Sequence, residues 1–143
     1  MTTTTKRYLA YPAAAAGISR ASSGSTAWSY SAYTEVVPVN TITSDYYLAG
    51  VTWTWHTPLA AADTTYEWII EIASDSAGSP VLQVQIPASV RADSLVGHTP
   101  SNMVIFPEPK LIVANTQLGV RVAYSLATTS NTLTGIKIMY MIP

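Results

Sequence analysis

Charged residues are scarce in this 143-residue chain, where they make up 10% of the sequence. A soluble domain ordinarily carries roughly 25%, so hydroxyl groups must cover much of the surface or neighbours must bury it. The seven basic and eight acidic residues are scattered and leave a net charge of −1. Because no basic stripe is available to release counterions from phosphates, nucleic acid is not an expected partner.

Cysteine is absent, which excludes disulfides, thiolate nucleophiles and cysteine-ligated zinc. Long apolar runs are absent too, since no window reaches the roughly 20 apolar residues of a membrane-spanning helix. We therefore expect no membrane partner, and stability must come from packing or from association with other subunits.

Motifs of catalysis and cofactor binding are also missing. The chain has no GxSxG elbow and no glycine-rich phosphate loop, and its two histidines, His56 and His98, have no metal-ligand spacing. Glu67 and Glu71 lie about 13 Å apart along a strand, whereas even inverting glycosidases hold their carboxylates within roughly 6.5–9.5 Å. We expect these two to be solvated charges on an outer face, and we predict no catalytic residue, metal or cofactor. The chain is expected not to be an enzyme.

What the sequence does have, from residue 28 onward, is alternation of apolar and polar residues with a period of two, which is typical of strands. Pro87 is expected to end a strand and 88–102 to form a long loop, while Pro107 and Pro109 indicate an edge or a corner. Expected strands are 28–37, 46–55, 66–72, 81–86, 103–106, 110–113, 117–124 and 132–142.

These strands and the lack of a helical period predict an all-β protein, a two-sheet β-sandwich. About eight strands in two sheets favour a jelly roll, with an immunoglobulin-like sandwich as the alternative. In the last strand, alternation places Ile136, Ile138, Tyr140 and Ile142 on one face, and Leu133, Lys137, Met139 and Met141 on the other. If Met139 and Met141 face outward, they are candidates for a subunit interface.

Residues 1–27 are rich in Thr, Ser and Ala and have no sustained period, so they are interpreted as an extended N-terminal arm ahead of a β-sandwich domain at 28–143. Pro12 interrupts a weakly apolar run, which argues against a signal peptide and for synthesis in the cytoplasm. The arm offers candidate contacts with a second subunit or with another protein: Lys6, Arg7, Tyr8, Tyr11 and Arg20.

Aromatic residues supply an alternative function. The alternation in 46–55 places Tyr47, Val51, Trp53 and Trp55 on one face, with Leu48 on the other. Trp53 and Trp55 would form a platform for sugar rings if exposed, but a core position is the favoured explanation, because each such ring can bury about 150–250 Å². The platform would imply a carbohydrate- or receptor-binding head, from a tail fibre or a binding module.

The C-terminal stretch Leu111–Tyr124, followed by a Ser/Thr-rich segment and the strand at 132–142, resembles the final hairpin of jelly-roll decoration (cement) proteins of tailed bacteriophages. The resemblance rests on the turn Ala114-Asn115-Thr116 and on the apolar-Arg-apolar strand Val120-Arg121-Val122. The low charge, the absence of cysteine and the arm are similar as well.

This resemblance implies a homotrimer on the outside of the virion capsid, made in the host cytoplasm, bound to the major capsid protein and bridging capsomers. The arm residues Lys6, Arg7, Tyr8, Tyr11 and Arg20 would then contact the capsid or a second subunit. Another virion role, in the tail or at the head–tail junction, is the remaining alternative.

Overall fold

The computed structural model describes residues 7–13, 19–22, 24–56, 64–75, 77–92, 101–126 and 132–143. The side chains of some strand residues at the borders of these ranges, including all four of Ser19–Ser22, are not described. Within these ranges the chain forms strands only, and no helix that could cross a membrane is present there. The strands are β1 (Leu9–Tyr11), β2 (Ser19–Ser22), β3 (Thr34–Val37), β4 (Tyr46–His56), β5 (Thr64–Ser74), β6 (Val81–Ala92), β7 (Ser101–Ile112), β8 (Leu118–Tyr124) and β9 (Thr132–Met141).

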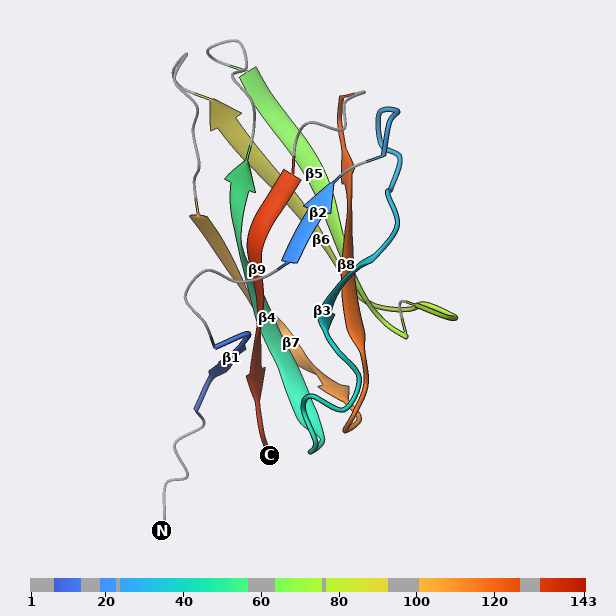
Figure 1. Cartoon of the computed structure of the whole chain (residues 1–143). Coiled ribbons are helices and arrows are strands. Elements are labelled where there is room, and N and C mark those ends of the chain that lie inside the picture. Colours follow the sequence, from blue (N-terminus) through green and yellow to red (C-terminus); the bar gives the residue numbers. More distant parts are fainter. Residues whose placement is uncertain are drawn as a thin grey trace.

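The strands form two antiparallel sheets packed face to face (Figure 1). The first sheet has the order β1-β9-β4-β7, with β2 also paired to β9, and the second has the order β3-β8-β5-β6. From β2 onward the chain therefore divides into the four-strand sets β2-β9-β4-β7 and β3-β8-β5-β6. That division is the order of a jelly roll built from two Greek keys. The predicted all-β jelly-roll sandwich is confirmed by this strand order.

Large aromatic and aliphatic side chains fill the space between the sheets. Trp68 on β5 and Tyr124 on β8 lie at the centre, with ring centroids 4.3 Å apart, and Tyr66 stacks on the other side of Tyr124 at 5.8 Å. Leu48 from β4 and Ile138 from β9 are fully buried from the opposite sheet. Such alternating inward residues on both sheets bury the apolar area that stabilises the sandwich.

A bulge in β4 changes which side chains face the core. The partners of β4 skip Ala49 between Leu48 and Gly50, so Tyr46 and Leu48 point inward on one side of the bulge. The prediction that Tyr47 shares a face with Val51 is wrong, because one extra residue reverses the alternation. Gly50 is required there, since a Cβ would lie 2.4 Å from the backbone oxygen of Val104.

A second bulge in β9 has the same effect on Leu133. Two residues of β4, Thr52 and Thr54, pair with Lys137 and Thr134, which are three positions apart, and Gly135 has a φ of 58°. Leu133 is thereby turned into the core with Ile136 and Ile138, whereas alternation alone predicts the outer face. The remaining assignment of β9, from Ile136 to Met139, keeps the predicted alternation.

Prolines lie in the two edge strands, β6 and β7. The prediction that Pro87 ends its strand is wrong: β6 continues to Ala92, and Pro87 pairs in register with Ile69. An edge strand tolerates proline because one side of its backbone has no neighbouring strand that needs an amide hydrogen. Residues 88–92, predicted as loop, belong to this strand, while 93–100 lie outside the described residues.

The strand β7 runs through Pro107 and Pro109, where two separate short strands are expected from the sequence. Leu48 pairs with Lys110 and Gly50 with Ile105, so the residues between Ile105 and Lys110 bulge out of the ladder. The predicted edge position is confirmed, since β7 ends the order of its sheet. The hairpin turn between β5 and β6 is also confirmed, closed by the Gly78 amide that donates to Asp75 O at 2.9 Å.

The predicted arm does not stand apart from the sandwich where it is described. Leu9–Tyr11 and Ser19–Ser22 pair antiparallel with β9, and Tyr11 packs against the core cluster. At these two places the segment covers the edge of its own sheet instead of leaving it for another subunit. The reason is that β9 would otherwise present an unpaired edge.

Candidate functional site

The outer faces of the two sheets differ in chemistry. In the second sheet, the cross-strand register aligns Glu71 of β5 with Gln85 of β6 and Arg121 of β8, and these three polar side chains cross the middle of the face. In the first sheet, large apolar side chains of β7 face outward, and β4 adds Tyr47 to them beside the threonines Thr52 and Thr54.

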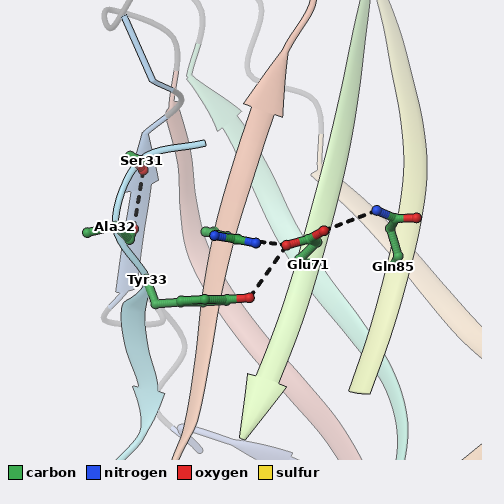
Figure 2. Close-up of polar contacts among 6 residues, drawn as sticks. Ser31, Ala32, Tyr33, Glu71 and Gln85 are labelled. Atoms are coloured by element: carbon green, nitrogen blue, oxygen red, sulfur yellow. Dashed lines mark hydrogen bonds and ion pairs between the residues drawn. The ribbon is translucent and has the colours of Figure 1, made fainter. Parts of the chain in front are cut away.

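Glu71 is the centre of the polar face (Figure 2). Its Oε2 lies 2.6 Å from Arg121 Nε and accepts a hydrogen bond from the Tyr33 hydroxyl at 3.5 Å. Its Oε1 accepts one from Gln85 Nε2 at 3.1 Å. The guanidinium carbon of Arg121 lies 4.3 Å from the ring centroid of Tyr30 and 4.6 Å from that of Tyr33. The two tyrosine rings therefore make cation–π contacts with the Arg121 guanidinium, and the Glu71 carboxylate compensates its charge.

The electrostatics of this cluster follow from burial and pairing. Burial opposes ionisation of Glu71, but hydrogen bonds from Arg121, Tyr30 and Gln85, with the charge of Arg121, hold its pKa below the usual value. Burial, together with the Glu71 carboxylate, raises the pKa of Tyr30 and Tyr33. Glu71 is therefore an ionised, fully engaged acceptor and not a proton donor poised for catalysis.

The cluster joins segments that are distant from one another in the sequence. Tyr30 and Tyr33 belong to the stretch between β2 and β3, while Arg121, Glu71 and Gln85 come from three different strands. The expectation of an outer-face position is confirmed for both glutamates, but Glu71 is buried rather than solvated, whereas Glu67 is exposed. Sequence could not reveal this pairing, because it depends on the register of β5 against β8.

Metal-binding chemistry finds no support in the described part of the chain, where no three His, Cys, Asp or Glu residues gather in one place. The side chains of His56 and His98 lie outside the described residues. The predictions of no catalytic residue, no metal and no cofactor stay predictions.

The apolar face of the first sheet, which we call the β4–β7 face, consists of outward residues from β4, β7 and the residue after it. Tyr47 pairs with Leu111, and Ile105 pairs with Gly50, so their side chains share the outer side. A shallow cavity of about 390 Å³, lined in part by Thr52, Met103 and Lys137, lies at one end of this face. The exposed apolar residues of the face are Tyr47, Met103, Ile105, Leu111 and Val113.

Met139 and Met141 lie on this same side of the sheet, since Met139 pairs with Gly50 and Met141 with Tyr47. Met141, however, is only 6% exposed, so it adds little accessible surface. The expectation that both methionines offer surface to a sister subunit is wrong for Met141, while Met139 is partly exposed. Met103, Ile105, Leu111 and Val113 were not predicted as interface residues, although apolar residues on both faces of a proline-bearing edge strand were a usable signal.

The candidate contact residues of the arm differ in exposure. Arg7 and Tyr8 are exposed, whereas Tyr11 is half-buried against the core of its own chain and offers little to a partner. Lys6 lies outside the described residues, and only the backbone of Arg20 is described, in β2.

The predicted sugar platform is not present. Trp53 is 3% exposed and belongs to the core cluster, because the bulge at Ala49 directs it inward. The side chain of Trp55 lies outside the described residues. A pair of tryptophans on one exposed surface is therefore excluded at these positions.

The structure confirms one feature of the C-terminal stretch that carries the resemblance, the turn, but not the other, the hairpin. The turn at Ala114-Asn115-Thr116 is confirmed: Asn115 has a φ of 64° and its amide donates to Ile42 O at 2.8 Å. The stretch from β8 to β9 is not a hairpin, however, because β8 lies in the second sheet and β9 in the first. The chain crosses between sheets at this point, as the jelly-roll order requires.

Comparison with solved structures finds chains of similar architecture. The chain is similar to the structure of Eiger TNF from S. frugiperda, with 13% sequence identity, a TM-score of 0.36, and coverage of 87% of this chain and 85% of that chain. No protein-family model matches the sequence. A search of curated proteins also finds no match. The jelly-roll assignment accordingly rests on the strand order.

Proposed function

We propose that this chain is a non-enzymatic structural protein of a tailed-bacteriophage virion, which associates with copies of itself as a trimer and binds the outside of the capsid, bridging capsomers. The observation that carries the proposal is the β4–β7 face, where Tyr47, Met103, Ile105, Leu111 and Val113 are exposed together. Contiguous apolar surface of this kind marks a protein–protein contact in a soluble protein.

The contrast between the two outer faces supports association through the first sheet. On the second sheet, Glu71, Arg121 and Gln85 satisfy one another within the chain. On the first, apolar side chains face solvent, and threonines such as Thr52 between them cost less to desolvate than charged side chains would. An obligate interface is typically more apolar than ordinary surface.

The virion assignment rests on the resemblance of composition and of the C-terminal stretch to phage decoration proteins. The low charge content, the absence of cysteine and the turn before the Val120-Arg121-Val122 strand support it. Leu9–Tyr11 pair with β9, so the described residues ahead of that strand that remain for capsid contact are Arg7 and Tyr8, which are exposed.

Two measurements test the proposal. Sedimentation velocity of the purified chain should give a trimer, and quantitative mass spectrometry of purified virions should give near-stoichiometric abundance relative to the major capsid protein. A monomer at micromolar concentration would contradict self-association. A few copies per particle would move the protein to the tail or a vertex, and absence from virions would overturn the virion role.

A further inference from the structure

Trp28 is held in an unusual backbone conformation at the surface. Its φ is 59°, which is a left-handed value that bulky residues rarely adopt, and its side chain is 45% exposed. Such a conformation costs about 1–3 kcal/mol and is common at ligand-binding positions. Neither the core nor the β4–β7 face requires this residue, so its exposure calls for another explanation.

The loop around Trp28 is rigidly tied. The Trp28 amide donates to Tyr124 O at 2.7 Å, and the Gly24 amide donates to Ser29 O at 2.9 Å. Ser29 closes the turn from inside: its hydroxyl accepts from the Thr26 amide at 3.1 Å and donates to Thr26 O at 2.7 Å. The backbone that carries the indole is therefore held by hydrogen bonds within the chain, so less of this loop has to be ordered when a ligand binds.

Beside the indole lies a groove of about 460 Å³ on the second sheet, within the usual size range of small-molecule sites. Its lining comes from Trp28, from β5 and from β6. The register explains the arrangement: Glu67 lies directly opposite Ser89, and Ile69 lies opposite Pro87, two residues further along the same face. The full lining is Trp28, Glu67, Trp68, Ile69, Pro87, Ala88 and Ser89.

The groove thus has an apolar part and a polar part. Ile69, Pro87 and the indole present apolar surface, while the exposed Glu67 carboxylate and Ser89 hydroxyl lie next to each other. The Glu67 backbone is fixed at both ends by Ser125, whose amide donates to Glu67 O at 3.0 Å and whose Oγ accepts from the Glu67 amide at 3.3 Å. A carboxylate accepts only, and a hydroxyl both donates and accepts.

We propose that this groove binds a saccharide, with one pyranose ring lying against the Trp28 indole. A pyranose has an apolar C–H face for the indole and hydroxyl groups that can donate to Glu67 and exchange hydrogen bonds with Ser89. An ammonium group would also be attracted by an indole beside a carboxylate, but a cage of several exposed aromatic rings, which recognition of ammonium uses, is not among the lining residues. The saccharide fits the mixed lining better.

The site is independent of the proposed self-association, since the groove lies on the second sheet and the β4–β7 face on the first. It uses none of the residues of the earlier sugar platform. Binding of a saccharide would give the assembled protein a means of attaching to a glycan-covered surface.

The full-length protein should be tested on an array of bacterial and plant polysaccharides, with hits measured by isothermal titration calorimetry using the purified oligosaccharide. Trp28→Ala should weaken binding by roughly tenfold or more, because it removes the stacking surface. Trp28→Phe should retain part of the affinity, and Glu67→Gln should also weaken binding. Tyr8→Ala removes an aromatic of similar exposure, 49%, and should leave binding unchanged.

Three results would overturn the proposal. The first is that the wild-type chain binds no saccharide, and the second is saccharide binding that Trp28→Ala leaves intact. The third is binding of tetramethylammonium in place of sugars, which would assign the groove to a cation. Unchanged far-ultraviolet circular dichroism, thermal unfolding midpoint and sedimentation of Trp28→Ala would show that its fold and association are retained. Loss of sugar binding with association unchanged separates this site from the proposed virion role.

Discussion

Arg121 Nε lies 2.6 Å from Glu71 Oε2 across two neighbouring strands, and the rings of Tyr30 and Tyr33 lie over the guanidinium of Arg121. This arrangement joins the chain before β3 to the middle of the second sheet. It also brings a buried carboxylate to a face that would otherwise be solvated. Its contribution to folding can be measured apart from any function.

Replacing Arg121 by Ala should lower the free energy of unfolding by about 1–3 kcal/mol, because Glu71 would stay buried without its charged partner. Urea denaturation measures the change. Lys110→Ala, which removes an exposed cation from β7, is the matched control and should change stability by at most about 0.5 kcal/mol. Equal effects of the two substitutions would show that the ion pair contributes nothing.

The pH dependence of stability has a definite sign at Glu71. Its pKa is lowered on folding from an ordinary value of 4.5, so the unfolded state binds more protons as the pH falls below that value. Stability from this group is fully present at neutral pH and is lost as the pH falls through the folded pKa. Glu71→Gln should be less stable at pH 7, and the difference from wild type should shrink toward pH 3 in parallel urea titrations. A difference that is constant with pH would contradict the assignment.

Trp53→Ala should cost about 3–5 kcal/mol, as expected for removal of a core aromatic. Trp28→Ala should cost roughly 1 kcal/mol or less, because that side chain is largely at the surface. Thermal unfolding followed by circular dichroism compares the two. A Trp53→Ala variant as stable as wild type would argue that Trp53 is not part of the core.

Leu111→Asp should dissociate the proposed oligomer, since it places a charge on the β4–β7 face directly opposite Tyr47. Leu82→Asp is the control: Leu82 is 51% exposed and Leu111 53%, but Leu82 lies on β6 of the other sheet. Sedimentation velocity should give a monomer for the first variant and the wild-type assembly for the second. If both variants keep the wild-type mass, the β4–β7 face is not the interface.

Removal of residues 1–22 should destabilise the sandwich and promote aggregation, because it deletes β1 and β2 and uncovers the edge of β9. Light scattering during thermal unfolding follows both effects. A shorter deletion, of residues 1–6, removes no described strand and should leave stability unchanged. The destabilisation expected for removal of residues 1–22 contrasts with the behaviour of a separate arm, because loss of such an arm would abolish attachment and leave the domain folded.

The periodicity of the sequence was enough to predict the sandwich and most strands, because apolar alternation reports directly on burial. It failed where a single inserted residue reversed the alternation, at Ala49 and near Gly135. It also failed at Pro87, since whether a proline is tolerated depends on the position of the strand in the sheet, which no local pattern contains.

The candidate surfaces were less predictable than the fold. The Glu71–Arg121 pair depends on the register of β5 and β8, which are separated by two other strands along the chain. Trp28 was assigned to a strand, and only its backbone angle reveals its role in a loop. Met139 could be placed on the outer side by alternation alone, but the burial of Met141 could not be foreseen.

The prolines of β6 and β7 have a consequence for how copies of the protein can join. Both strands border the same side of the sandwich, where a cavity is lined by Ile86 and Pro87 of one and Phe106 and Pro107 of the other. Because proline supplies no amide hydrogen and the bulge of β7 interrupts the ladder, neither edge can readily accept a strand from a neighbour. Open-ended fibres built by edge-to-edge pairing are thereby disfavoured, and the fold directs association to its broad faces, where symmetry can close an assembly at a finite size.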